Sequence, residues 1–521
     1  MKKKILALLL ATLMLLSLVA CMGGGRDRGD IEKIESDTDP LTKDDVVRIV
    51  FYSHPSWPYQ DSWKAMEYIR EGIGATLEVN AIPNAELGAK YAVMFADPET
   101  LPDTVPFDGK LGGDIHGADG SAVAFEAVAD YMPNYTKWVD SLSEDDYANY
   151  IQSRKSADGN IYYSPTYGTD TAGSVMAWIY REDIFTKHNL KTPTNFDELY
   201  EVCKELKALY PNSYPLCMRS GIGMNLNVLA PSYDTDWAGM GFYYSEKDGK
   251  WKYGVLDPAM KEYLEFCLKM VDEGLLNPDF ATIATNEWQQ LITTNRGFIT
   301  PEYQTRVDFF NSIFRDNGEP GRFAAMLPPV ANTEKGGNLV MSNRIDPYGN
   351  ILCNTRDHDR IANAAKYLDW FYADENVELV SWGKEGETFE IVDGKKQYIT
   401  NGSNEPVKTL YGFGVPQTFY RIEREAIESA ESEDIAKNRA MVLEHRVAKD
   451  NPANFIAFDN EEQELMTDKR DTIISYTNET ITKILLGQLP LSAYDEIEAT
   501  CYEYGLQEVL DTYEAAYARV K

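Results

Sequence analysis

Cysteine and histidine are scarce in this chain of 521 residues, which has six cysteines and five histidines. The cysteines are widely spaced and form no C-x-x-C pair, which argues against a disulfide framework or a zinc site. The histidines are scattered, and the sequence has no H-E-x-x-H, G-x-S-x-G or phosphate-binding loop. We therefore expect no cofactor, no resident metal and no catalytic set, so the protein is not expected to be an enzyme.

Positive charge is also in short supply, with 50 Lys and Arg against 83 Asp and Glu, for a formal net charge of −33. Such a chain repels phosphate backbones, so no nucleic-acid partner is expected. The acidity mainly concerns solubility and does not reveal the sign of a local binding cleft. Because acids are so numerous, the presence of two of them is no evidence for the paired carboxylates of a glycosidase.

Long hydrophobic runs are limited to Ile5–Ala20, which follows Lys2–Lys4 and leads into Cys21. This pattern predicts a secretory signal peptide over residues 1–20, since the run is short for a bilayer-spanning helix of ~20 apolar residues. The final Leu-Val-Ala-Cys resembles the bacterial lipobox, which implies lipidation at Cys21. The predicted location is the outer face of the bacterial cell membrane, and the alternative is an ordinary signal with a chance cysteine.

The mature chain is long enough for two or more domains. Residues 21–45 are Gly-rich and then charged, which predicts a flexible tether. Order is expected from the strand Val46–Tyr52, followed by a helix that Gly72 and Gly74 end and a second strand, Leu77–Ala81. Strand, helix and strand with short links indicate a parallel α/β layer.

Further elements follow the same alternation along the chain. The expected strands are Ser174–Tyr180 and Gly297–Thr300, and the expected helices are Thr194–Leu209, Met260–Glu273, Ile361–Tyr372, Asp468–Leu486 and the C-terminal region from Ser492. We therefore expect an α/β protein with a largely helical C-terminal region.

Several short motifs occur in a familiar order. They are Leu101–Asp103, Asp158–Pro165, Ala177–Asp183, Leu190–Leu199, Trp382–Gly386 and Gly505–Tyr517. In this order the chain resembles the extracellular solute-binding proteins of carbohydrate ABC transporters, the family-1 type that includes maltose-binding protein. The resemblance implies a two-lobed periplasmic-binding-protein-like fold with a ligand cleft between the lobes.

This resemblance also implies how the chain divides between the lobes. The N-terminal lobe is expected to hold residues 46–165 and 301–350, and the C-terminal lobe residues 166–300 and 351–521. Crossings between the lobes are expected near Tyr163–Thr166, Phe298–Pro301 and Gly349–Leu352. Some relatives carry a calcium loop after the helix that corresponds to Thr194–Leu209, but Tyr210–Leu216 lacks the necessary carboxylates, so no calcium site is expected.

Candidate ligand contacts lie first in the loop after the first strand. Trp57 and Tyr59 sit in a Pro-rich loop at the carboxyl end of that strand, where an α/β sheet meets its ligand. Aromatic rings can stack on the C–H faces of sugars, although Trp57 could equally pack under its loop. Asp103 and Asp170 fall on turns and could accept sugar hydroxyls, although Asp170 could instead cap its turn.

The second lobe and its crossing supply further candidates. Trp237 lies on an irregular loop, which favours ligand contact over packing, whereas Trp288 lies on a predicted helix and suits a core. Trp382 and Glu385 occupy a Gly-flanked turn that suggests a loop over the cleft. The second-lobe candidates are completed by Tyr233, Tyr303 and Arg306.

The resemblance implies a lipid-anchored, monomeric binding component of an ABC importer. It would capture an oligosaccharide by hinge closure and deliver it to permease subunits. One alternative is a surface-anchored glycosidase or lyase. Another is a receptor that presents its ligand to a sensor kinase.

Overall fold

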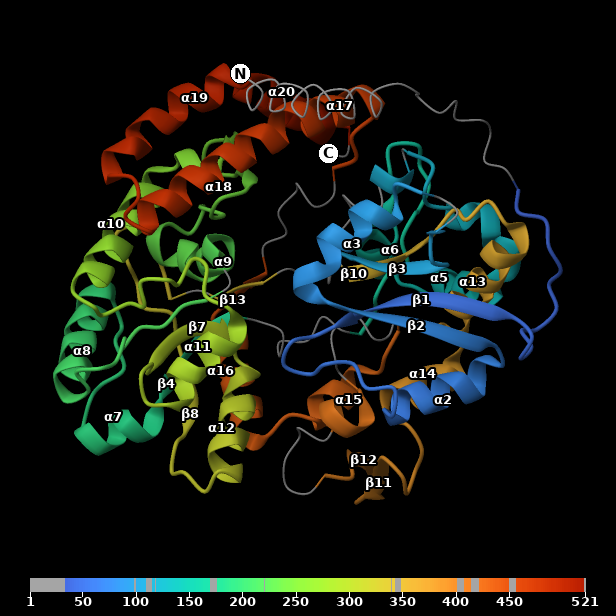
Figure 1. Ribbon diagram of the computed structural model, residues 1–521, viewed down its shortest axis with the longest axis horizontal. Helices are drawn as coiled ribbons and strands as arrows, with labels where there is room; N and C mark the ends of the chain where they lie inside the picture. The colour runs from blue at the N-terminus through green and yellow to red at the C-terminus, as the bar shows by residue number, and fades with distance from the viewer. Residues whose placement is uncertain are drawn as a thin grey trace, which may run out of the picture.

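The computed structural model describes residues 33–97, 100–108, 115–117, 119–168, 176–219, 221–338, 340–342, 348–400, 407–413, 421–448 and 456–519. These residues form two lobes that lie side by side (Figure 1). The lobe on the right is drawn mostly in blue and orange and the lobe on the left mostly in green and red, because each lobe combines chain segments that are far apart in sequence.

Lobe one is built on a four-stranded sheet with the order β10-β3-β1-β2. Its strands are β1 (Val46–Ser53), β2 (Thr76–Pro83), β3 (Thr104–Asp108) and β10 (Tyr348–Leu352). β1 runs parallel to β2 and β3, and β10 pairs antiparallel with β3. The expected parallel strand–helix–strand unit is thus confirmed, with α2 (Lys64–Ile73) as the crossover helix.

The sequence of α2 explains its place on the sheet. Ala65, Met66 and Ile69 share its buried face, as expected for an amphipathic helix. The helix ends at Gly74, whose φ of 78° is left-handed and whose Cα faces the Leu41 carbonyl so closely that a Cβ would lie 2.8 Å from its oxygen. Only glycine is comfortable in such a position.

The remaining elements of lobe one surround this sheet. They are η1 (Asn84–Glu86), α3 (Leu87–Met94), η3 (Phe125–Tyr131), α5 (Pro133–Asp140), α6 (Glu144–Tyr150), η4 (Gln152–Arg154), α13 (His358–Trp370), α14 (Asp374–Ser381), the hairpin β11 (Phe389–Val392) and β12 (Lys395–Tyr398), η7 (Val407–Tyr411) and α15 (Arg424–Ser429).

Lobe two contains a three-stranded antiparallel sheet with the order β7-β4-β8. Its strands are β4 (Met176–Arg181), β7 (Ile299–Tyr303) and β8 (Phe323–Met326). A hairpin of β5 (Phe242–Ser245) and β6 (Lys250–Tyr253) and a parallel pair of β9 (Val340–Ser342) and β13 (Arg446–Ala448) complete its strands among the described residues.

Helices make up most of the rest of lobe two. They are α7 (Glu182–His188), α8 (Phe196–Leu209), α9 (Gly221–Tyr233), η6 (Gly254–Leu256), α10 (Pro258–Asp272), α11 (Thr285–Thr293), α12 (Arg306–Asp316), α16 (Glu433–Glu444), α17 (Asn460–Leu465), η9 (Met466–Arg470), α18 (Asp471–Leu485), η10 (Leu491–Glu496), α19 (Ile497–Glu503) and α20 (Leu506–Ala518). The expected helical C-terminal region is therefore confirmed, and it lies across the top of lobe two in Figure 1.

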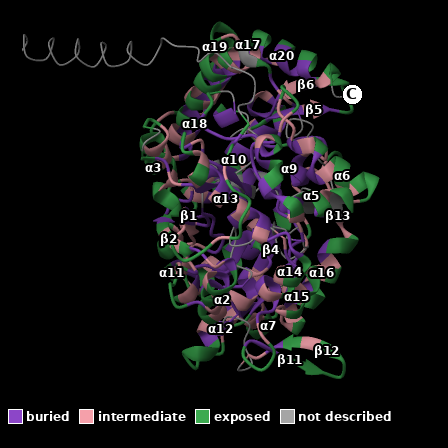
Figure 2. Ribbon diagram, turned by 90° about the vertical axis from the view of Figure 1, so that its right-hand side faces the viewer, coloured by how far each residue is buried: buried purple, intermediate pink, exposed green. Residues whose placement is uncertain are grey.

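Two large hydrophobic cores divide the chain differently from the expected boundaries. The core of lobe one joins residues 34–161 to residues 352–426, because helix α13 packs Ile361, Ala365 and Leu368 beside β1. The cores of lobe two include Phe298, Phe310 and the C-terminal helices. Residues 301–338 thus belong with lobe two and 351–426 with lobe one, and the buried residues fill the interiors seen in Figure 2.

Two of the expected crossing segments lie next to each other. The Ser164 N–H donates to the Asn350 carbonyl at 2.9 Å, so Tyr163–Thr166 runs beside Gly349–Leu352 at the edge of lobe one. The crossing expected at Phe298–Pro301 is wrong, because this segment leads into β7, which is a strand of the lobe-two sheet. Within the described residues, the chain passes from lobe one to lobe two at residues 430–432, since Ala426 belongs to the core of lobe one and Ile435 to a core of lobe two.

Part of the expected tether packs against lobe one. Ile34 is buried in the core of that lobe, the Ser36 N–H donates to the Tyr131 hydroxyl at 2.8 Å, and the Ser36 hydroxyl donates to Asp359 at 2.8 Å. The expectation of a flexible tether is therefore wrong for residues 33–45. The signal peptide and Cys21 lie outside the described residues.

Within the described part of the chain, no helix combines the length and the apolar content that crossing a membrane requires.

Candidate functional site: the surface between the lobes

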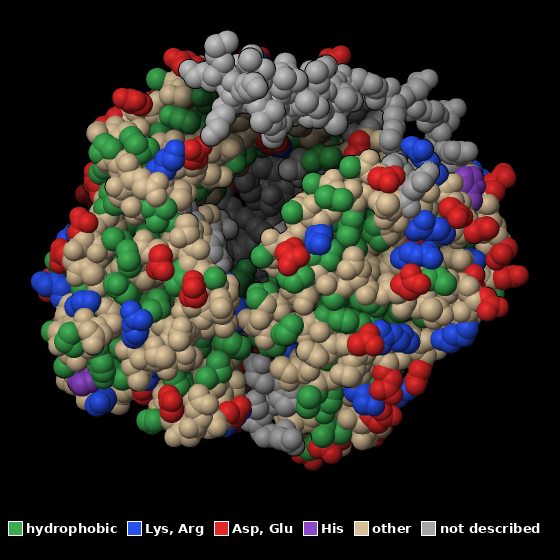
Figure 3. Space-filling model, in the orientation of Figure 1, with side chains coloured by type: hydrophobic (Ala, Val, Ile, Leu, Met, Phe, Trp, Pro, Cys, Tyr) green, Lys and Arg blue, Asp and Glu red, His purple; other side chains and the backbone are tan. Residues whose placement is uncertain are grey.

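The surface of the molecule is hollowed between the two lobes (Figure 3). The loop at the carboxyl end of β1 reaches across to lobe two. Its Ser56 hydroxyl accepts hydrogen bonds from Arg306 Nη1 at 2.8 Å and from Gln289 Nε2 at 3.2 Å. Arg306 begins α12 and Gln289 belongs to α11, so this loop is in direct contact with both helices.

Trp57 is the centre of this contact. Its ring is only 6% exposed and stacks on His54, with ring centroids 4.6 Å apart. Arg306 lies 5.3 Å and Phe309 6.1 Å from the ring, and both come from lobe two. Lys408 of lobe one lies 4.2 Å from the same ring. Aromatic faces attract cations, so Trp57 holds positive charge from both lobes.

We call the residues of this contact the inter-lobe junction. They are His54, Ser56, Trp57, Gln289, Arg306, Phe309 and Lys408.

The junction brings two cationic side chains, Arg306 and Lys408, to the same ring. Burial, followed by the nearby charges of Arg306, Lys408 and Arg219 in that order, lowers the pKa of His54 to about 3. The His54 imidazole is therefore neutral at physiological pH and adds no charge of its own. Arg306 is itself only 3% exposed.

Behind the junction, a buried ion pair fixes the end of β7. Arg219 donates to both carboxylate oxygens of Glu302, at 2.6 and 2.9 Å, and its guanidinium lies 4.7 Å from the Trp288 ring. Glu302 also accepts the Tyr303 N–H at 2.9 Å. This arrangement holds Tyr303, which is 36% exposed, at the strand end three residues before Arg306.

Trp57, Tyr303 and Arg306 are thus the predicted site residues that the structure places at or beside the junction. Tyr59 lies in the same loop but turns toward lobe one, where its ring contacts Phe51 at 4.8 Å and its hydroxyl donates to Asp61 at 2.9 Å. Trp57 was expected either to contact ligand or to pack under its loop. In the structure it is packed, and the groups that pack against it include Arg306 and Phe309 of lobe two.

Asp103 has a structural environment. Its carboxylate is buried and accepts hydrogen bonds from Arg360 Nε at 2.9 Å and from the Arg48 N–H at 2.7 Å. Burial raises the pKa of Asp103, although both of these partners act to lower it. β1 and β3 are parallel. Asp103 lies at the amino end of β3, whereas Trp57 follows the carboxyl end of β1, so the two residues lie at opposite ends of these strands. The expectation that it lies near the cleft is therefore wrong.

Tyr233 and Trp237 belong to the core of lobe two. Trp237 is 2% exposed, its Nε1 donates to the Gly254 carbonyl at 3.0 Å, and it packs edge-on against Tyr233 at 6.0 Å. The expectation of a Trp exposed on its loop is wrong, because the loop folds back over α9 and the β5–β6 hairpin. Trp288 is buried in a core, as its helical position suggested.

Trp382 and Glu385 form no loop over the hollow. Trp382 is buried in lobe one, donates from Nε1 to Glu423 at 2.7 Å and packs on Tyr398 at 5.0 Å. Glu385 is exposed on the turn that leads into β11. The predicted lid at these residues is therefore wrong. Asp170 lies outside the described residues.

The junction residues that were not predicted from the sequence are His54, Ser56, Gln289, Phe309 and Lys408. Ser56 could have been found, since it precedes Trp57 in the same loop, and Phe309 lies one helical turn after Arg306 on α12. Lys408 offers no local signal, because its approach to Trp57 depends on a contact between residues about 350 positions apart in the chain.

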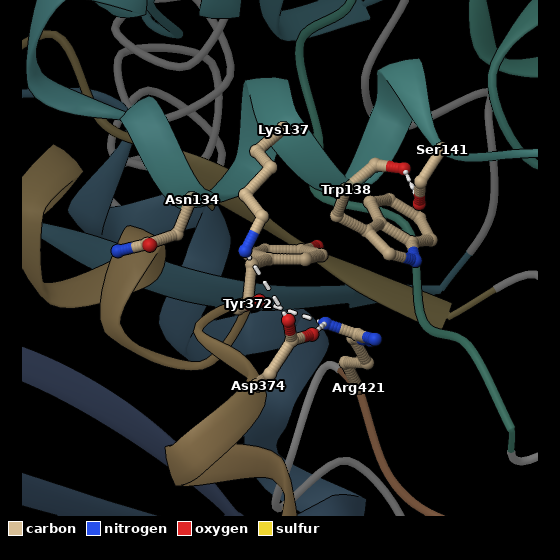
Figure 4. A pocket seen from close by; sticks show the side chains of 7 residues that line it. All are labelled: Asn134, Lys137, Trp138, Ser141, Tyr372, Asp374 and Arg421. Atoms are coloured by element: carbon tan, nitrogen blue, oxygen red, sulfur yellow. Dashed lines mark hydrogen bonds and ion pairs between the residues drawn. The ribbon is translucent and has the colours of Figure 1, made fainter.

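A small surface pocket lies within lobe one (Figure 4). It holds about 80 Å³ and is lined by Asn134, Lys137, Trp138, Ser141, Tyr372, Asp374 and Arg421. Its charges are paired, since Asp374 accepts Arg421 at 2.8 Å and Lys137 at 3.3 Å. Ligand sites of roughly 300–1,000 Å³ are usual, so this pocket is too small for an oligosaccharide.

Two α/β lobes joined by passing chain segments, with a hollow between them, define the two-lobed solute-binding class of protein. The family model described as "Bacterial extracellular solute-binding protein" matches residues 66–378, which is more than half of the chain. The chain belongs to this family.

Individual relatives agree with the assignment. Lipoprotein LipO of Bacillus subtilis (strain 168) is 21% identical over 505 residues, covering 92% of this chain and 93% of its own. The polygalacturonan/rhamnogalacturonan-binding protein YtcQ of the same strain is 22% identical over 294 residues, covering 55% of this chain and 56% of its own.

Solved structures also resemble this chain over nearly its full length. The alginate-binding protein AlgQ2, in a structure without calcium ion, superposes with a TM-score of 0.73 at 19% identity and covers 91% of this chain and 98% of its own. The Streptococcus pneumoniae ABC-transporter substrate-binding protein FusA, in complex with kestose, has a TM-score of 0.72 at 14% identity and covers 91% and 99%. These similarities confirm the fold.

Proposed function

We propose that this protein is the membrane-anchored binding component of an ABC importer for oligosaccharides. The observation that carries the proposal is the inter-lobe junction, where Trp57 of lobe one meets Arg306 of lobe two beside the hollow between the lobes. A ligand in that hollow contacts groups of both lobes. It therefore stabilises the state in which the lobes are close, which is the physical basis of hinge closure.

The ligand class is supported by what the relatives bind. The names of AlgQ2, YtcQ and FusA each state a saccharide, namely alginate, polygalacturonan or rhamnogalacturonan, and kestose. FusA is also described as part of an ABC transporter. An oligosaccharide that is imported intact requires binding and release but no chemistry, in keeping with a family of binding proteins.

Binding without turnover is the decisive test. The purified full chain, incubated with a panel of oligosaccharides, should bind one of them in calorimetry and become more compact in small-angle scattering. Chromatography should then recover the sugar intact. Conversion beyond one equivalent would replace this proposal with a surface glycosidase or lyase. Binding without compaction would refute hinge closure as the mechanism of capture.

Anchoring through Cys21 is tested separately. Cells fed a clickable fatty acid should label the wild-type protein and a Cys353→Ser control, in which a buried thiol is altered. A Cys21→Ser variant should lose both the label and its membrane association, because a diacylglyceryl group at this cysteine is the proposed anchor. Equal labelling of all three proteins would refute the anchor.

Import is distinguished from sensing by transport. A strain that lacks this gene should fail to accumulate the radiolabelled oligosaccharide that the purified protein binds, and the wild-type gene should restore uptake. Normal uptake combined with loss of a transcriptional response to the sugar would instead favour a receptor for a sensor kinase.

A further inference from the structure

One passage of the chain between the lobes lies between α15 and α16 (Figure 1). Ala426 belongs to the core of lobe one, and Ala430 packs against that core. Ile435 belongs to a core of lobe two. Glu431 and Ser432 therefore stand where the chain leaves one lobe for the other. Any movement of the lobes relative to each other has to change the surroundings of these two residues.

Arg439 spans this passage with its side chain. It belongs to α16 of lobe two, and its Nη1 donates to Glu428 Oε1, on α15 of lobe one, at 2.8 Å. Its Nε lies 2.8 Å from Glu431 Oε2, within the passage itself. Because α15 and α16 pack on different cores, a movement of the lobes changes how Arg439 is shared between Glu428 and Glu431.

Glu431 is covered by groups from both lobes. Its side chain is only 5% exposed. The charged groups that act on it are Arg439 of α16, Glu428 of α15 and Asp308 of α12, so its carboxylate faces one cation and two further carboxylates. Among the described residues, neither oxygen of Glu431 accepts a well-aligned hydrogen bond, although Arg439 is within ion-pair distance. A buried carboxylate in this condition is costly to ionise.

The charge of Glu431 therefore changes near neutral pH. Burial, opposed by Arg439 and assisted by Glu428 and Asp308, raises the pKa of Glu431 from 4.5 to about 7. When Glu431 is neutral, the guanidinium of Arg439 is available to Glu428, and the two lobes are bridged. When Glu431 is ionised, it competes with Glu428 for the same guanidinium and repels both neighbouring carboxylates.

The same groups give the direction of the coupling between this charge and lobe movement. Separating α15 from α12 and α16 admits water to Glu431, and its pKa then falls back toward 4.5. Since the pKa is higher in the packed arrangement, protonation of Glu431 stabilises that arrangement. This stabilisation is fully present below pH 4.5 and is lost as the pH rises through 7.

We propose that Glu431 is a proton-operated latch in the passage between the lobes: its neutral form holds the lobes in the arrangement seen here, and its ionised form releases them. This inference rests on the hinge motion of the proposed function but not on the ligand. It predicts that the ligand-free protein moves its lobes more freely in alkaline than in acidic solution.

Scattering at different pH values tests the latch. Small-angle scattering on the ligand-free full chain, fitted as two lobe arrangements, should show a shift of at least tenfold toward the more extended one between pH 5 and pH 8, since one pKa unit corresponds to a factor of ten. The expansion should level off above pH 7. Glu431→Gln keeps the shape of the side chain but not its titration, and should stay compact throughout. Glu425→Gln, on an exposed position of α15, is the matched control and should expand like wild type.

A second variant tests the sharing of Arg439. Glu428→Gln removes a carboxylate that raises the pKa of Glu431, so the expansion should level off at a pH lower by roughly half a unit or more. An unchanged pH dependence would contradict the sharing. An extended form at every pH would show that the Arg439–Glu428 pair alone holds the lobes, which would also overturn the latch.

The outcomes for the latch and for the proposed function are distinguishable. If the dimensions do not change with pH, or if Glu431→Gln expands like wild type, the latch is refuted, and compaction by a bound oligosaccharide would still support the proposed function. If the pH dependence is present and is lost in Glu431→Gln, the latch is supported even if none of the tested sugars binds. If neither pH nor a bound sugar changes the dimensions, hinge closure and the latch both fail.

Discussion

Ser432, in the segment that links the two lobes, is bound to Asp308 on α12. Its N–H donates to Asp308 Oδ2 at 3.3 Å and its hydroxyl donates to Oδ1. Beside it, Arg439 of α16 donates to Glu428 at 2.8 Å and lies 2.8 Å from an oxygen of Glu431. Two carboxylates therefore share one guanidinium, and the charge of Asp308 also acts on Glu431, at a point where the chain passes between lobes.

This crowding predicts a pH-dependent contribution of Glu431 to stability. Burial raises the pKa of Glu431 from 4.5 to about 7, and the neighbouring charges of Glu428 and Asp308 act in the same direction. Because the folded pKa exceeds the unfolded one, this contribution is most favourable below pH 4.5 and is lost as the pH rises through 7. Glu431→Gln should therefore stabilise the protein at pH 8 by on the order of 1–3 kcal/mol.

Urea unfolding at pH 5 and pH 8 measures this effect. The stabilisation by Glu431→Gln should be much smaller at pH 5, where Glu431 is already protonated in the folded protein. Glu425→Gln, on an exposed position of α15, is the control and should show little change at either pH. A loss of stability at pH 8 on substitution of Glu431 would show that its bond to Arg439 outweighs its desolvation.

Trp237→Ala should cost stability and leave ligand affinity almost unchanged. The ring is buried against Tyr233, and its N–H bond to Gly254 is lost on truncation. Removing a buried Trp typically costs ~3–5 kcal/mol. Thermal melting and calorimetry with the identified sugar check the two effects, with Tyr502→Ala at an exposed position as the control. A tenfold drop in affinity for the sugar with an unchanged melting temperature would show that Trp237 belongs to the binding site.

Asp103→Asn should destabilise lobe one. Arg360 would lose its charged partner, which it contacts at 2.6 Å through Nη2, while remaining partly buried. Leaving such a charge unpaired costs roughly 3–5 kcal/mol. Exposed Asp130→Asn, whose surface pair with Lys33 contributes little, is the comparison in urea unfolding. Equal midpoints for the two variants would contradict the structural role of Asp103.

The cysteines after Cys21 should resist labelling until the protein unfolds. Cys203, Cys217, Cys267, Cys353 and Cys501 are free and buried, and burial raises the pKa of each thiol. The reactive thiolate is therefore scarce and inaccessible. Pulsed iodoacetamide labelling across a urea series, read by peptide mass spectrometry, should give one midpoint for Cys203, Cys267 and Cys501, which share a core. Labelling of any of these thiols in native buffer would contradict their burial.

Calcium should be unnecessary for folding. The segment Tyr210–Leu216 offers no carboxylate side chain to a metal ion. Melting temperatures with EDTA and with added calcium should coincide. A clear drop in EDTA that calcium alone reverses would demonstrate a calcium site outside this segment.

Local elements could be predicted because their signals are local. The helix expected at Thr194–Leu209 is α8, although Asn195 provides the cap, with its side chain accepting the Glu198 N–H at 2.9 Å. The helix expected at Met260–Glu273 is α10, which Asp257 caps and Pro258 opens. Such patterns depend on neighbouring residues alone.

The lobe boundaries and most of the site could not be predicted in this way. Which lobe receives α13 depends on packing between residues about 300 positions apart, and no periodicity encodes that choice. Trp237 lies in an irregular segment and Trp382 directly follows α14, yet both are buried in cores, so the absence of a regular period at these positions did not indicate exposure. Trp57 and Arg306 were found because each lies at the end of a predicted strand or crossing.

The docking of residues 33–45 on lobe one sets the length of chain that would separate the protein from the proposed lipid at Cys21. Ile34 is already part of the core of that lobe, so about a dozen residues separate it from Cys21. Even fully extended, they span at most about 45 Å. The proposed lipid at Cys21 would therefore keep lobe one within this distance of the bilayer, in the same membrane as the proposed permease. Such confinement would let even a weak docking surface suffice for delivery, so rapid release after each delivery becomes compatible with frequent encounters.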